Sequence, residues 1–274
     1  MRKLTNIKLI TSGNIIELFE YKKGFVYGKS EKKSETRIKI KADLDNPLVF
    51  ALKLENRKRT LQSSKSALKR LINANAGHWK DKNGKPFMPI FLNLTFAENI
   101  TNIQKANYAF TKFKQRLDYE ITGGKKSYLK YAGVIEFQKR GAVHYHIIFF
   151  NMPFIKNVYD KMRKIWGKGH IIINAIKDLQ TVASYICKYM TKSEVDERLL
   201  GQKSYFTSKG LLKPVEILDR GKIENIINNI PEFIKPYENK FKSDFCEEIK
   251  YKRYDFANHK DEKEKLNILL EYNL

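Results

Sequence analysis

The segment Glu136–Phe150 constrains the fold more than any other part of the chain. Its residues predict a strand, a tight basic turn and a second strand that is rich in β-branched and aromatic residues. The second strand carries His144 and His146, which are two residues apart. Side chains alternate between the two faces of a strand, so both imidazoles lie on the same face. The chain is therefore expected to contain an antiparallel hairpin with two histidines on one side.

The length of the turn decides which side chains join the histidines. If the turn Lys139–Ala142 closes with an odd loop or a bulge, Glu136 and Gln138 share the histidine face, whereas a loop of two or four residues puts them on the opposite face. Two imidazoles with a carboxylate or amide oxygen suit Mg²⁺ or Mn²⁺ and leave positions for a phosphate. The alternative is that both histidines are half-buried strand residues bonded to their neighbours.

The charge of the chain favours a polyanionic partner. Lys and Arg number 53 against 30 Asp and Glu, a formal net charge of +23. Nucleic acid is the simplest partner for such an excess, and a solvated basic surface is the alternative. We find no apolar run of membrane-spanning length and no signal peptide. The two cysteines form no motif, which favours a reducing cytoplasm, here that of a bacterial host, over a disulfide or zinc framework.

We expect three segments: a β-rich N-terminal extension (1–84), a catalytic domain (85–215) and a C-terminal extension (216–274). Within the first, residues 1–54 are predicted to be strands, at Ile15–Tyr21, Gly24–Gly28 and Thr36–Ala42. Residues 56–75 are predicted to form a basic helix. This helix either lies along a DNA backbone or is a solvated helix packed on the sheet; its candidate DNA contacts are Arg57, Arg59, Lys65 and Lys69.

The middle and the end of the chain alternate between strand and helix patterns. This alternation predicts an α+β fold in which a central antiparallel sheet is backed by helices. Strands are expected at Ile90–Phe96, Tyr128–Phe137 and His170–Ala175, and helices at Asn102–Tyr119, Val158–Trp166 and Asp178–Lys192. Beyond these, 222–236 is predicted to be helical with a break at Pro231, 237–256 to form one or two strands, and 259–274 to form a charged helix.

The predicted helix Asp178–Lys192 holds the second chemical element. Tyr185 and Tyr189 are one turn apart and flank its apolar stripe, with Lys192 beside them and Lys188 further round. Tyrosines at such a boundary commonly serve only for packing. A phenol becomes a credible nucleophile towards phosphorus where a cation and lysines stabilise the phenolate and the transition state.

Three blocks occur in order along the chain. They are Phe91-Leu-Asn-Leu-Thr95, Glu136-x-Gln-x-Arg140-Gly-x-x-His144-Tyr-His146 and Tyr185-Ile-Cys-Lys188-Tyr189-Met-Thr-Lys192. They resemble motifs I, II and III of the HUH endonucleases, and most closely those of the two-tyrosine rolling-circle replication initiators of single-stranded-DNA phages and small bacterial plasmids. The resemblance covers about residues 88–192, and Ser204–Pro214 is similar to the segment that follows the catalytic helix in that group.

The resemblance implies a role for each matching residue. His144 and His146 hold a divalent ion, Mg²⁺ or Mn²⁺, with Glu136 as the third ligand and Gln138 as the alternative. Tyr185 and Tyr189 are the paired nucleophiles and Lys188 is the motif lysine. The HUH fold is an antiparallel sheet of about five strands with flanking helices, here with β-rich extensions at both ends. Arg140 and Lys192 are further candidate DNA contacts.

The implied activity is nicking and rejoining of single-stranded origin DNA through a 5′-phosphotyrosine ester, so the enzyme acts as both nuclease and ligase without ATP. No Gly-x-x-x-x-Gly-Lys segment is present, so a host helicase or supercoiling must separate the strands, and the free 3′ end primes a host DNA polymerase. Two alternatives remain: a transposase or relaxase of the same chemistry, and a non-catalytic DNA-binding module.

Overall fold

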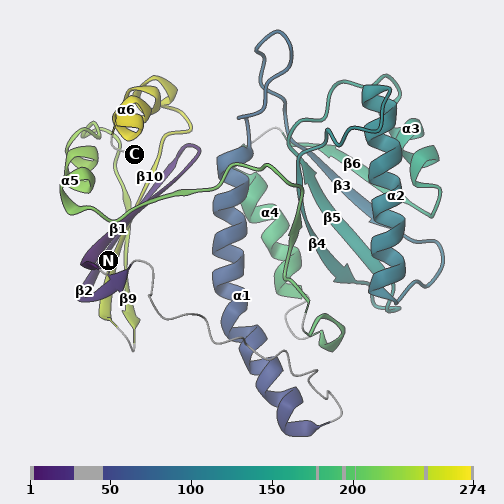
Figure 1. The fold of residues 1–274 in the computed structure, drawn as a ribbon, viewed down its shortest axis with the longest axis horizontal. Coiled ribbons are helices and arrows are strands. Elements are labelled where there is room, and N and C mark those ends of the chain that lie inside the picture. Colours follow the sequence, from purple (N-terminus) through teal and green to yellow (C-terminus); the bar gives the residue numbers. More distant parts are fainter. Residues whose placement is uncertain are drawn as a thin grey trace. The chain divides into compact units, whose positions relative to one another are not determined.

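The computed structural model describes residues 3–27, 46–176, 179–192, 196–200, 202–243 and 246–272. The chain divides into two compact units, Ala42–Leu212 and a second unit that combines Met1–Lys41 with Lys213–Leu274. Each unit contains one five-stranded antiparallel sheet with helices packed against it (Figure 1). The predicted α+β class is confirmed, and the arrangement is consistent with the sheet-plus-helices fold of the HUH type.

The sheet of the unit Ala42–Leu212 has the strand order β6-β3-β5-β4-β7, and every neighbouring pair is antiparallel. Its strands are β3 (Ile90–Thr95), β4 (Tyr131–Phe137), β5 (Val143–Phe149), β6 (Ile171–Ala175) and β7 (Phe206–Thr207). The helices are α1 (Pro47–Asn75), α2 (Ile103–Thr122), α3 (Val158–Trp166) and α4 (Leu179–Lys192), with a short 3-10 helix at Glu197–Leu199.

Both faces of this sheet are covered, as Figure 1 shows. Alternate side chains of β3 and β5 pack with α2 and α3 on one face, for example Leu94 and Tyr145. The intervening side chains, including Phe91 and Ile148, pack with α1 and α4 on the other. The central strands are buried on both sides, which explains why β5 is an almost unbroken apolar run interrupted by its two histidines.

Helix α1 begins at Pro47, whereas the sequence predicted strands up to residue 54; that part of the β prediction is wrong. The side chain of Asn46 accepts hydrogen bonds from the amides of Leu48 and Val49, and Pro47 occupies the first helical turn, where its missing N–H costs nothing. These two residues start the helix. Its buried contacts with the unit come from Leu61, Leu68 and Ile72.

The other unit is assembled from both ends of the chain. Its sheet has the order β8-β1-β2-β10-β9, and its helices pack on a core that includes Leu9, Ile16 and Phe256. The strands are β1 (Lys3–Ser12), β2 (Ile15–Tyr27), β8 (Val215–Ile217), β9 (Tyr237–Ser243) and β10 (Glu247–Asp255), and the helices are α5 (Arg220–Asn228) and α6 (Lys260–Tyr272).

Several expectations about these ends are modified. Strand β1 was not predicted, because a register shift between Thr5 and Ile7 interrupts its alternation. The predicted strand Thr36–Ala42 lies outside the described residues. The division into units joins the two predicted extensions in one sheet and groups α1 with the middle of the chain. Within the described ranges, no helix has both the length and the apolar character that crossing a membrane requires.

Gly169 lies where the segment before β6 meets the end of β3. The amides of Thr95 and Ala97 donate to the carbonyls of His170 and Lys168, on either side of this glycine. Its φ is +150°, and a Cβ built there overlaps the backbone of Thr95 and Ala97. Only glycine therefore allows this close approach.

We predict that Gly169→Ala lowers the free energy of unfolding by about 1–3 kcal/mol, the usual cost of added atoms in a packed site. The matched change is Gly124→Ala, because a Cβ at Gly124 has nothing within 4 Å. It should leave stability unchanged or slightly higher. Urea unfolding of both variants measures the difference, and equal midpoints would contradict the prediction.

Candidate metal and nucleophile site

The hairpin β4–β5 sets the geometry of the site. Glu136 pairs directly with His144, and Phe137 pairs with Val143. Gln138 donates its amide N–H to Ala142, and the amide of Gly141, which has a φ of +88°, donates back to Gln138. The loop is thus three residues long, Lys139 to Gly141, with a glycine in the left-handed region that such loops favour. An odd loop puts Glu136 on the histidine face.

Glu136, His144 and His146 form a compact set of candidate ligands. Their ligand atoms all lie within 4.8 Å of one another, and His146 is 1% exposed. Nε2 of His146 lies 2.6 Å from a carboxylate oxygen of Glu136. Two imidazoles and one carboxylate are donors that borderline and hard divalent ions accept. The triad is therefore compatible with a divalent metal ion.

Asn93 on β3 completes the setting of His146. Its side-chain oxygen lies 2.7 Å from Nδ1 of His146, the residue opposite it in the sheet register. An amide oxygen accepts the Nδ1 hydrogen, which leaves Nε2, on the Glu136 side, to bind a cation. Such outer partners fix the orientation of a ligand imidazole. Sequence reasoning gave Asn93 no role, although a buried asparagine between two leucines was a usable signal.

Helix α4 brings both predicted nucleophiles to the triad. The ring of Tyr189 stacks on the ring of His146, with 3.4 Å between centroids and an angle of 18° between planes. The Tyr189 hydroxyl donates to the Tyr185 oxygen at 3.2 Å. Phe91, from β3, supports both rings from the core side. The two phenol oxygens therefore lie side by side next to the candidate ligands.

The two phenols differ in environment. Tyr185 is 37% exposed, whereas Tyr189 is partly buried against His146. Burial raises the pKa of the Tyr189 phenol well above its ordinary value, and the hydrogen bond with Tyr185 raises it further. The exposed Lys188 places its ammonium group 5.9 Å from the centroid of the Tyr185 ring. Tyr185 is thus the phenol nearer to solvent and to a cation.

Gln138 and Arg140 have a different part. The Gln138 side-chain oxygen accepts from Nε of Arg140 at 3.1 Å. The Arg140 guanidinium also donates to the carbonyls of Phe96 and Ala97, beyond the end of β3. The turn is thereby tied to the neighbouring strand, and Gln138 is engaged in that link.

The predicted contacts on α1 separate into two kinds. Arg57 is buried, donates to the carbonyl of Leu199 at 2.7 Å, and has its guanidinium pKa lowered by burial. These features argue for a structural role. Arg59 is exposed, and one of its guanidinium nitrogens donates to Asn56. Burial raises the pKa of the Cys187 thiol on α4 to about 11, and the charges of Lys69 and Lys65 oppose that rise. These two lysines therefore lie close to α4.

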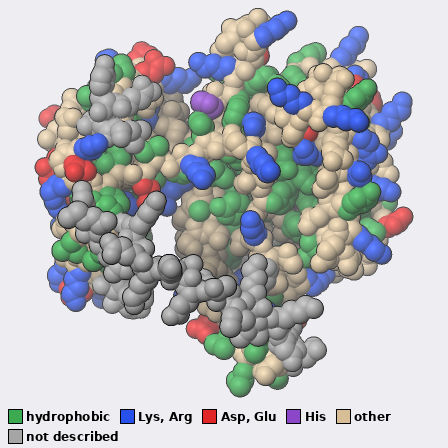
Figure 2. Space-filling model, in the orientation of Figure 1, with side chains coloured by type: hydrophobic (Ala, Val, Ile, Leu, Met, Phe, Trp, Pro, Cys, Tyr) green, Lys and Arg blue, Asp and Glu red, His purple; other side chains and the backbone are tan. Residues whose placement is uncertain are grey.

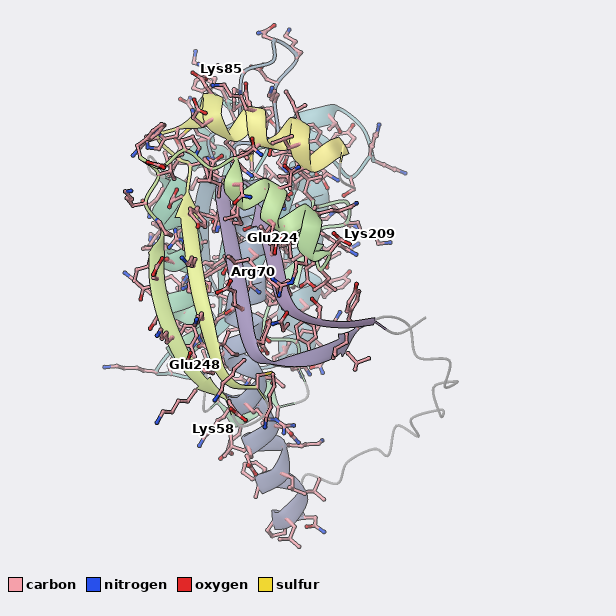
Figure 3. All side chains as sticks on the ribbon, turned by 90° about the vertical axis from the view of Figure 1, so that its left-hand side faces the viewer. Lys58, Arg70, Lys85, Lys209, Glu224 and Glu248 are labelled. Atoms are coloured by element: carbon pink, nitrogen blue, oxygen red, sulfur yellow. The ribbon has the colours of Figure 1, made fainter. Side chains whose placement is uncertain are left out.

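The visible face of the unit Ala42–Leu212 carries many Lys and Arg side chains and few Asp and Glu (Figure 2). Lys58 and Arg70 also project from α1 in the side view of Figure 3. Both observations agree with a polyanionic partner. The side chain of Lys192 lies outside the described part of the structure.

We predict that Glu136→Ala lowers the affinity for Mn²⁺ by more than about tenfold, since even outer partners of a metal ligand are worth about 10–100-fold. Gln138→Ala should leave the affinity unchanged, because its side-chain oxygen is bonded to Arg140. Isothermal titration of the two variants with Mn²⁺ decides between them. The reverse order would make Gln138 the third ligand.

Comparison with known proteins agrees with this part of the chain. Residues 89–194 match the model of a family described as replication-associated protein ORF2. The searches of curated proteins and of solved structures found no match. The matched region contains the triad and both tyrosines and makes up less than half of the chain. It supports a replication initiator family, for which DNA is the expected partner.

Proposed function

We propose that this protein initiates rolling-circle DNA replication by nicking and rejoining single-stranded origin DNA through a tyrosine. The observation that carries the proposal is the stacking of Tyr189 on His146, with the Tyr185 oxygen 3.2 Å from the Tyr189 oxygen. Two potential nucleophiles thus adjoin a set of metal ligands. The family match over residues 89–194 supports a role in replication.

The triad would hold Mg²⁺ or Mn²⁺ through Glu136, His144 and His146. When bound, the ion would neutralise charge on the scissile phosphate as the nucleophile approaches. Asn93 keeps the His146 ring oriented for this task. Lys188 adds a positive charge beside Tyr185, which favours its phenolate form.

In the chemical step, a tyrosine oxygen forms a bond to phosphorus while the bond from phosphorus to the 3′ oxygen breaks. The phenol proton ends on the 3′ oxygen, so a free 3′ hydroxyl leaves and the 5′ end stays on the protein as a phosphotyrosine ester. One ester replaces another, so a later 3′ hydroxyl can reverse the step and reseal the strand. The released 3′ end would prime a host DNA polymerase after a host helicase opens the duplex.

We assign the first cut to Tyr185. It is the more exposed phenol, and its oxygen accepts the hydrogen bond from Tyr189, so it can lose its proton without breaking that bond. Tyr189 has a raised pKa and would act second, after Tyr185 has become an ester and no longer competes for the phosphate site. Two nucleophiles in one active site allow a second cut before the first end is released.

A transposase or relaxase would use the same chemistry on a different DNA end, and a DNA-binding module would use none of it. Strand cleavage separates the last of these from the rest. Transfer between two origin copies, which yields a circle, separates an initiator from an enzyme that joins its end to unrelated DNA.

We predict that Tyr185→Phe and Tyr189→Phe each retain some nicking of a short single-stranded origin oligonucleotide with Mn²⁺, and that the double variant forms no covalent adduct. Each single variant should fail to release a circle, because its one nucleophile is still occupied. Denaturing gels detect the adduct, and peptide mapping of the unmutated protein locates it.

The controls address the metal and the assignment. Chelator, or His144→Ala with His146→Ala, should abolish nicking and spare DNA binding. Full nicking by the double histidine variant would refute the metal site. An adduct found only on Tyr189 would reverse the order of the two tyrosines, and an adduct on neither would end the two-tyrosine proposal.

We also predict a strong salt dependence of DNA binding. Removal of three charges, through Arg59→Ala, Lys65→Ala and Lys69→Ala, should lower the slope of log affinity against log salt by about 2 if each contacts one phosphate of a single strand. The matched variant removes three exposed lysines from the loops that follow α2 and precede α3, namely Lys125, Lys126 and Lys156. An equal effect of both triple changes would return α1 to a purely structural role.

A further inference from the structure

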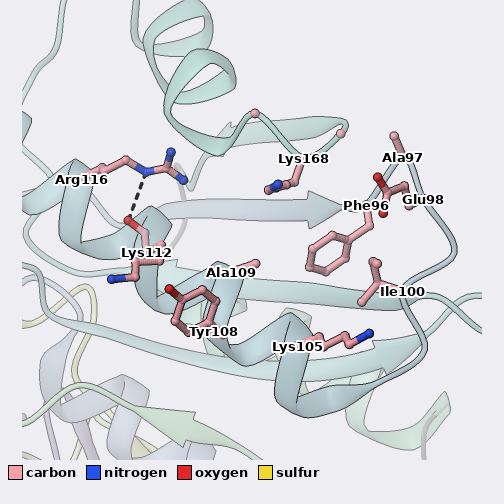
Figure 4. A pocket seen from close by; sticks show the side chains of 12 residues that line it. Phe96, Ala97, Glu98, Ile100, Lys105, Tyr108, Ala109, Lys112, Arg116 and Lys168 are labelled. Carbon is pink, nitrogen blue, oxygen red and sulfur yellow. Dashed lines mark hydrogen bonds between the residues drawn. The ribbon is translucent and has the colours of Figure 1, made fainter.

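A second site opens at the same end of the sheet but on the face covered by α2 and α3. It is a cavity of about 660 Å³ between the start of α2, the segment after β3 and the loop 167–169 (Figure 4). Phe96, Ile100 and Ala109 form its apolar part. None of the residues proposed above for the metal, the nucleophiles or the α1 contacts lines it.

The rim of this cavity is basic and aromatic. Lys105, Tyr108, Lys112 and Arg116 follow one another at spacings of three and four residues, so they share one face of α2. Tyr108 is 66% exposed, and the Lys112 ammonium lies 5.3 Å from the centroid of its ring. Lys168 faces them from the loop, as Figure 4 shows. These four cations make no ion pair with a described residue.

The cavity is connected to the metal triad through the backbone of β3. Thr95 pairs directly with His144, and the next residue, Phe96, already lines the cavity. Arg140 fastens the β4–β5 turn to the carbonyls of Phe96 and Ala97. A strand held at the triad would therefore need only to pass over the end of the sheet to reach the cavity.

We infer that this cavity binds a nucleotide of the single-stranded DNA beside the cleavage position, an inference that rests on the proposed function. The base stacks on Tyr108, and the flanking phosphates lie among the four cations. Glu98 is the one carboxylate in the lining. Its oxygens accept hydrogen bonds from an exocyclic amino group, so the site favours cytosine or adenine over thymine.

A DNA strand fits this site better than a free nucleotide. The cations on α2 extend from residue 105 to residue 116, about 16 Å along a helix at 1.5 Å per residue. Such a row matches a succession of phosphates rather than the phosphate group of one mononucleotide. The sequence also lacks the Gly-x-x-x-x-Gly-Lys loop that commonly holds a free nucleoside triphosphate.

The test measures equilibrium binding by the full chain carrying Tyr185→Phe and Tyr189→Phe, which keeps the readout independent of cleavage. Fluorescence anisotropy follows labelled single-stranded oligonucleotides that contain the origin sequence. Tyr108→Ala should weaken binding by about tenfold or more, the usual effect of removing a stacking aromatic. Lys112→Ala should weaken binding and lower the salt slope by about 0.7.

The matched controls are Tyr119→Ala, an exposed tyrosine further along α2, and Lys156→Ala, an exposed lysine before α3. Both should bind as the parent does. Tyr108 is mostly exposed, so its removal should leave the thermal unfolding temperature unchanged, which a melting curve verifies. Equal affinities for Tyr108→Ala and Tyr119→Ala would overturn the inference.

Base preference gives a second readout. Oligonucleotides that differ at one position, cytosine or thymine, should be distinguished by the parent and not by Glu98→Gln. Competition with dCMP tests the alternative ligand: displacement that depends on Tyr108, while oligonucleotide affinity does not, would reassign the cavity to free nucleotides. If nicking fails in the earlier experiments while binding still depends on Tyr108, the cavity stands and only the catalytic proposal falls.

Discussion

His146 is held from three directions, and the candidate site depends on that arrangement. Asn93 on β3 bonds one ring nitrogen, Glu136 on β4 lies at the other, and Tyr189 on α4 covers the ring face. One imidazole thus joins two neighbouring strands and a helix to the strand that carries it. An imidazole fixed in this way loses little freedom when it takes a ligand, so binding energy is not spent on ordering it.

The parity of a three-residue loop lies behind this geometry. Pairing of Glu136 with His144 follows from the loop Lys139 to Gly141, and a slip of one residue would turn the carboxylate to the opposite face. The sequence predicts the two histidines on one face from strand periodicity alone. It leaves the loop length open, because Gly141 is compatible with more than one turn. Asn93 lies 53 positions from His146, and no local pattern reports a register between strands so far apart.

Amphipathic patterns predicted α2 and α4 well, since Phe110 and Ile186 sit on faces that the core requires. Charge patterns were weaker guides. Arg57 belongs to a basic run yet is buried against the Leu199 carbonyl, because a long guanidinium side chain can reach a backbone acceptor across a helix. The sheet built from the two chain ends was beyond sequence reasoning, since the pairing of Ile15 with Asp255 leaves no local trace.

That sheet has a consequence for synthesis of the protein. Strand β2 finds its partner β10 only after more than two hundred further residues have been made, whereas the unit Ala42–Leu212 is continuous in the chain. Domains commonly fold as they emerge from the ribosome, and contacts of long sequence separation form slowly. The continuous unit can therefore fold during translation, while the first two strands wait with one edge exposed until the last part of the chain is released.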